Sequence, residues 1–174
     1  MSGPYLDIYA LTARRDAATV DAFLDTFVDK TAAAAHIGGL ELMMEPLGAT
    51  NPPVGFDEWE WVPVSSLTAI VDWGLCVPRR TFTTYLPWCR GIVRTAVLSF
   101  TADNQLIVGI AVYDDEHGHL VTDNAAKVLL DDLMRVMGAH RGLILAEGPP
   151  PRTEAEFAVA ERAPAFVFST VVPS

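Results

Sequence analysis

The densest run of metal-ligating side chains in the sequence lies between residues 114 and 119. It contains three carboxylates and two histidines: Asp114, Asp115, Glu116, His117 and His119. Two histidines one residue apart can point the same way on an extended segment, and neighbouring carboxylates could complete a coordination sphere. A solvated loop between a strand and a helix has the same composition. Two alternatives therefore stay open, a metal-dependent binding or enzymatic site and a polar loop.

Side chains that could support covalent catalysis form a weaker pattern than the metal-ligating run at residues 114–119. Cys89 is followed by Arg90, whose charge could lower a thiol pKa, although a loop cysteine beside an arginine is usually inert. No serine lies in a G-x-S-x-G motif, and no glycine-rich loop matches a P-loop or a dinucleotide fingerprint. We therefore expect no cofactor and a protein that binds rather than catalyses.

Charge is unevenly distributed along the chain. Residues 1–78 carry 11 acids and three bases, and residues 101–134 carry seven acids and one base. Between them, residues 79–100 carry four arginines and no acid: Arg79, Arg80, Arg90 and Arg94. Arginines among aromatic residues are typical of nucleic-acid binding, but a formal net charge of −10 repels a polyanion. The pattern favours a basic protein as the partner.

One acidic stripe is a candidate interaction surface. Asp21, Asp25 and Asp29 are spaced four apart, opposite the apolar side of a predicted helix. Like charges at this spacing cost about 0.2–0.5 kcal/mol per pair, so a functional reason is worth considering beside general solubility. The hypothesis adds a nearby loop rich in acids and tryptophan, which is favoured at interfaces although it also packs in cores. The complete predicted surface is Asp21, Asp25, Asp29, Asp57, Glu58, Trp59, Glu60 and Trp61.

Hydrophobic periodicity predicts the elements that position these residues. Strands are expected at 5–12, 40–44, 80–86, 92–101, 106–113, 142–146 and 165–172, and helices at 17–28, 67–77, 123–137 and 153–162, with a Gly/Pro-rich loop at 47–56. The expected fold is a single domain, 1–174, of class α+β or α/β. It has a mixed, mostly antiparallel sheet packed with two long and one or two short helices.

The sequence shows no pattern typical of a secretory signal or a membrane span. The N-terminus has no basic start followed by an apolar run, and no stretch approaches the roughly 18 apolar residues of a membrane span. The two cysteines do not stand in a C-x-x-C spacing. These observations predict a cytoplasmic protein with no membrane partner.

Three segments resemble a group of uncharacterised small bacterial proteins that look like immunity proteins of polymorphic toxin systems. They are residues 7–25 with DIYALT, RRD and DAFLD, the hairpin residues 97–109, and GPPP followed by TEAEF at 148–157, together about a third of the chain. The resemblance implies a protein that neutralises a toxin, here a basic toxin domain met by the acidic surface. It carries over no catalytic residue, and this sequence departs from the group in the loop at 47–56. The alternatives are an enzyme or metal-dependent binder centred on residues 114–119, and a self-associating structural or regulatory subunit that uses Trp59 and Trp61.

Overall fold

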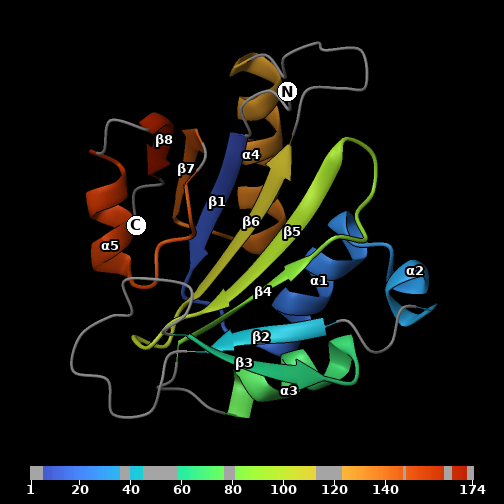
Figure 1. Cartoon of the computed structure of the whole chain (residues 1–174). Coiled ribbons are helices and arrows are strands. Elements are labelled where there is room, and N and C mark those ends of the chain that lie inside the picture. Colours follow the sequence, from blue (N-terminus) through green and yellow to red (C-terminus); the bar gives the residue numbers. More distant parts are fainter. Residues whose placement is uncertain are drawn as a thin grey trace.

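The chain forms one antiparallel sheet with helices on both of its faces (Figure 1). The computed structural model describes residues 6–35, 40–44, 59–76, 81–112, 123–146, 148–162 and 166–171. In chain order the elements of these residues are β1 (Leu6–Thr12), α1 (Ala17–Phe27), α2 (Lys30–Ala35), β2 (Leu40–Met44), β3 (Glu60–Val64), α3 (Leu67–Cys76), β4 (Phe82–Leu86), β5 (Val93–Phe100), β6 (Leu106–Val112), α4 (Asp123–Met137), β7 (Arg141–Ala146), α5 (Glu154–Ala160) and β8 (Phe166–Val171).

The strands lie in the order β3-β2-β4-β5-β6-β1-β7-β8. Every neighbouring pair is antiparallel in the described ranges. The expectation of a mostly antiparallel sheet packed with helices is therefore confirmed, and of the two fold classes left open, α+β and α/β, the structure shows α+β. The strands expected at 92–101 and 106–113 are β5 and β6, which form a hairpin joined by a turn in which Asn104 has a positive φ of 64°.

Helices α1, α3 and α4 pack on one face of the sheet and α5 packs on the other. Alternate residues of β1 show the division: Ile8 and Ala10 belong to the core under α1, α3 and α4, whereas Tyr9 and Leu11 pack with Phe157 of α5. Strand β6 is buried along its whole length, as its apolar sequence predicts for a covered central strand. None of the helices in the described ranges combines the length and hydropathy needed to span a bilayer.

Local signals fix the helix ends. The carboxylate of Asp16 caps α1 by accepting the backbone N–H of Thr19 at 2.8 Å, and this hydrogen bond lowers the pKa of Asp16. Ser66 caps α3 by accepting the N–H of Ala69. Helix α4 stops at Gly138, whose φ of 56° suits glycine.

Two parts of the expected pattern differ from the structure, and a third lies outside the described residues. Helix α1 ends at Phe27 rather than at Val28, and a separate short helix, α2, follows it. The segment from Glu60 to Val64, expected as part of a loop, is the edge strand β3. Pro63 hides this strand from sequence patterns, but an edge position tolerates a proline. The predicted loop at 47–56 lies outside the described residues.

Candidate functional site

A groove of about 440 Å³ opens between α1, α2 and α3. Its apolar walls come from Leu24 of α1, Ala33 of α2 and Val71 of α3, all of which are buried. Small side chains on its rim, including Ala17 and Ala34, leave the space unfilled. We call this the α1–α3 groove; its lining residues are Ala17, Asp21, Leu24, Lys30, Ala33, Ala34, Ser66, Leu67, Thr68, Val71 and Asp72.

The rim of the groove is polar and mainly acidic. Asp21 comes from α1 and Asp72 from α3, and both residues are exposed. Lys30 of α2 places its Nζ 2.6 Å from Asp25 Oδ1 and 3.8 Å from Asp21 Oδ1. The carboxylate of Asp72 has no ion pair or hydrogen bond within the part of the chain that the structure describes. An apolar floor with carboxylates at its edge suits an amphipathic, positively charged ligand.

Two of the three predicted stripe residues lie together, and the third does not join them. Asp21 and Asp25 project from α1 with side chains 61% and 68% exposed. Asp29 lies beyond the helix and caps α2: its Oδ1 accepts the backbone N–H groups of Thr31 and Ala32, both at 3.0 Å. The prediction that Asp29 continues the acidic face of α1 is therefore wrong.

Tertiary pairing explains why α1 stops early. Val28 is extended, with φ −110° and ψ 136°, and forms an isolated antiparallel bridge with Cys89. Around it, Asp29 donates its N–H to the carbonyl of Trp88, and Arg90 donates its N–H to the carbonyl of Phe27. This pairing takes the chain out of the helix although its apolar periodicity continues through Val28.

Trp61 lies on the other side of the sheet from the acidic face of α1. In β3, Val62 and Val64 face the core that α1 and α3 cover. Trp61 pairs with Met43 and, by alternation, points to the opposite face, where its side chain is 46% exposed. Trp59 is half-buried and Glu60 is exposed, and Asp57 and Glu58 lie outside the described residues. The predicted surface is therefore split between the two faces.

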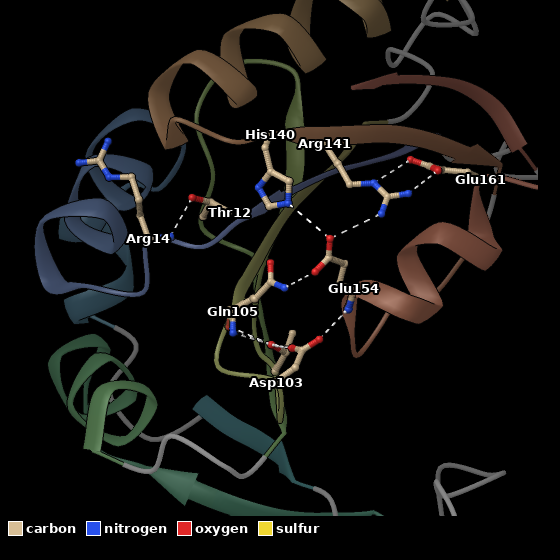
Figure 2. A network of polar contacts seen from close by, with 9 residues as sticks. Thr12, Arg14, Asp103, Gln105, His140, Arg141, Glu154 and Glu161 are labelled. Carbon is tan, nitrogen blue, oxygen red and sulfur yellow. Dashed lines mark hydrogen bonds and ion pairs between the residues drawn. The ribbon is translucent and has the colours of Figure 1, made fainter. Parts of the chain in front are cut away.

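The densest polar cluster in the described ranges attaches α5 to one end of the sheet (Figure 2). Figure 2 shows Gln105, His140 and Arg141 converging on Glu154: Gln105 Nε2 donates to Glu154 Oε2 at 2.7 Å, and Arg141 Nη1 lies 3.8 Å from Glu154 Oε1. His140 Nε2 lies 3.9 Å from the same Glu154 oxygen.

Two further contacts complete this attachment. Arg141 binds Glu161 through both Nε and Nη2, and Asp103 accepts the N–H of Glu154 at the start of α5. Because α5 is short and has one fully buried side chain, Phe157, these contacts hold it in place. We interpret the cluster as structural.

The structure describes the predicted nucleophile, Cys89, but not the predicted metal site. Residues 114–119 lie outside the described residues, and the described ones contain no group of three or more metal-ligating side chains. Burial raises the pKa of the Cys89 thiol to about 11, and its Sγ donates to the carbonyl of Leu86 at 3.2 Å. Cys89 is therefore protonated at neutral pH and unsuited to nucleophilic attack.

Among the four arginines of residues 79–100, Arg90 has a structural role within the chain. Arg90 Nη1 donates to the carbonyl of Asp25 at 2.8 Å, near the C-terminus of α1, which satisfies a carbonyl at the negative end of that helix. Arg79 and Arg80 lie outside the described residues, and Arg94 is exposed on β5.

Sequence patterns missed the groove itself. Asp21, Lys30 and Asp72 come from three separate helices that periodicity does not connect, and only tertiary packing brings them together. Asp72 could have been recognised as a polar residue in an apolar helix, but not as the counterpart of Asp21.

Comparison with protein-family models, curated proteins and solved structures gives no match. The resemblance to immunity proteins therefore stays a prediction.

Proposed function

We propose that this protein is a protein-binding module that takes up a basic, amphipathic segment of another protein in the α1–α3 groove. The observation that carries the proposal is the apolar groove of about 440 Å³ with Asp21 and Asp72 on its rim. The groove replaces the larger predicted surface, because Trp61 of that surface lies on the other face of the sheet.

Each part of the groove contributes differently to binding. Apolar side chains of the partner would enter the groove against Leu24, Leu67 and Val71, and the removal of the partner's own apolar surface from water supplies most of the affinity. The exposed carboxylates contribute little energy, about 0.2–1 kcal/mol per ion pair, but they select a cationic partner and fix its register. A net charge of −10 accelerates the encounter at low ionic strength.

The specific form of this proposal is an immunity protein that neutralises a basic toxin domain in the cytoplasm. The groove's acidic rim, the acidity of the whole chain and the sequence resemblance described above support it. Neutralisation would follow from steric cover of the toxin, which requires no catalytic group in this chain.

Affinity capture from the producing cell tests the proposal. The wild type is compared with the double variant Asp21→Lys/Asp72→Lys and with Asp131→Lys/Glu41→Lys, which has the same net charge but leaves the groove intact. The proposal predicts a basic protein that the wild type and the control capture and the groove variant loses. Equal capture by all three would contradict it. Relief of growth arrest when the captured protein is co-expressed with the wild type, but not with the groove variant, tests the immunity function.

A second candidate function is self-association through the sheet edge. Strand β3 ends the sheet, and its Trp61 is 46% exposed. Unpaired edge strands can add a strand from another chain. Light scattering across a concentration series, for the wild type and for Trp61→Ala, separates this candidate from a monomeric binder. A mass that rises with concentration in the wild type alone would favour it.

A further inference from the structure

Lys30 occupies the position at the groove where a partner's cation would bind. Its side chain lines the α1–α3 groove, and its ammonium contacts Asp25 at 2.6 Å and approaches Asp21 at 3.8 Å. Asp21 is also a rim carboxylate of the groove. The protein's own lysine therefore contacts the charge that we expect a basic partner to contact.

The position of Lys30 is not explained by the local helix. It is the first residue of α2, where the positive end of the helix dipole disfavours a cation. The chain contains only one other lysine, Lys127. The segment before α2 is fixed by the cap from Asp29 and by the hydrogen bond from its N–H to Trp88, so the flexible side chain alone spans the distance to α1.

Such a contact is easily broken. The Lys30 side chain is 38% exposed and its two acidic partners are more than half exposed, so water screens the ion pairs strongly. A lysine ammonium on four flexible carbons can move without any change in the backbone. Asp72, on the other side of the groove, offers a second carboxylate to a displaced or incoming cation.

We propose that Lys30 is a displaceable internal competitor of the partner. In the free protein its ammonium neutralises Asp21 and Asp25, and on binding a lysine or arginine of the partner replaces it at these carboxylates. This inference rests on the proposed function and adds a regulatory feature to it. Lys30 lowers the affinity for every basic partner, so only a segment that also fills the apolar floor binds well. The competitor thus increases selectivity at the expense of affinity.

A peptide titration tests the inference. The probe is a fluorescent helical peptide with leucines on one face and lysines on the other, hereafter the leucine–lysine peptide. Its affinity is measured by anisotropy for the wild type, Lys30→Gln, Lys30→Arg and Lys127→Gln at low and moderate salt. Lys127→Gln changes the net charge by the same amount away from the groove, and Lys30→Arg keeps the competing charge.

We expect Lys30→Gln to bind the peptide about two- to fivefold more tightly than Lys127→Gln does, as loss of a competing exposed ion pair implies. Lys30→Arg should stay near the wild type. If Lys30→Gln binds no better than Lys127→Gln, the inference is wrong while the proposed function stands. If neither the wild type nor any variant binds, both are wrong. Melting temperatures of the four proteins show whether a loss of affinity comes from unfolding.

Discussion

Filling the α1–α3 groove with a larger side chain of the protein itself should both stabilise the fold and weaken partner binding. Ala34 is exposed, lines the groove and lies in α2, so Ala34→Phe directs a phenyl ring toward Leu24 and Val71. If about 100 Å² of apolar surface leaves water, roughly half of what a core phenylalanine buries, the gain is about 2.5 kcal/mol. Lost side-chain freedom and lower helix propensity cost about 1 kcal/mol. The net stabilisation of about 1.5 kcal/mol raises the melting temperature by about 3–6 °C for a chain of this size.

The same ring takes the place of the partner's apolar anchor. Loss of one buried aliphatic side chain of the partner costs about 1.5–3 kcal/mol, so affinity for the leucine–lysine peptide should fall at least about tenfold. Ala35→Phe is the matched control, because Ala35 is exposed on the same helix and does not line the groove. Calorimetric melting and anisotropy titration measure both effects. An Ala34→Phe variant that binds the peptide as tightly as Ala35→Phe does would refute the assignment of the groove as the binding site.

Three further predictions concern the scaffold. Asp16→Ala should lower the free energy of unfolding at pH 7 by about 1 kcal/mol in urea titrations, because α1 loses its cap. Since folding lowers the pKa of Asp16, its stabilisation is complete above the unfolded pKa and is lost as pH falls through the folded pKa, so wild type and variant should converge in acid. Iodoacetamide at pH 8 should modify exposed Cys76 well before Cys89, whose pKa of about 11 leaves little thiolate, and equal rates by mass spectrometry would contradict this. Arg141→Met should cost about 1–3 kcal/mol in urea because it leaves the largely buried Glu161 carboxylate unpaired, while Arg141→Lys should cost less.

Elements set by local signals were predictable from the sequence. The helices expected at 17–28 and 123–137 and the strands expected at 92–101 and 106–113 are bounded by signals that act over a few residues, namely the cap at Asp16, the glycine stop at Gly138 and the turn around Asn104, and the structure forms an element in each of these ranges. The uninterrupted apolar run of β6 likewise predicts a central strand covered on at least one face, and the structure buries all of its residues. The antiparallel α+β fold follows from these elements.

Features that depend on distant segments were not predictable. The end of α1 is set by the pairing of Val28 with Cys89, about sixty residues later in the chain. Strand β3 forms because β2 offers it a partner at the sheet edge, in spite of Pro63. The groove is formed by three helices together, and of the predicted acidic stripe only Asp21 lines it.

The most direct test of the account is a nuclear magnetic resonance titration of the ¹⁵N-labelled protein with the leucine–lysine peptide. If the groove receives the peptide, backbone amide shifts change along the groove, at Asp21, Lys30, Ala34 and Asp72, and stay constant on β3 around Trp61 and on α5. Changes confined to β3 or α5, or no change at saturating peptide, would contradict the claim that the α1–α3 groove receives a basic partner.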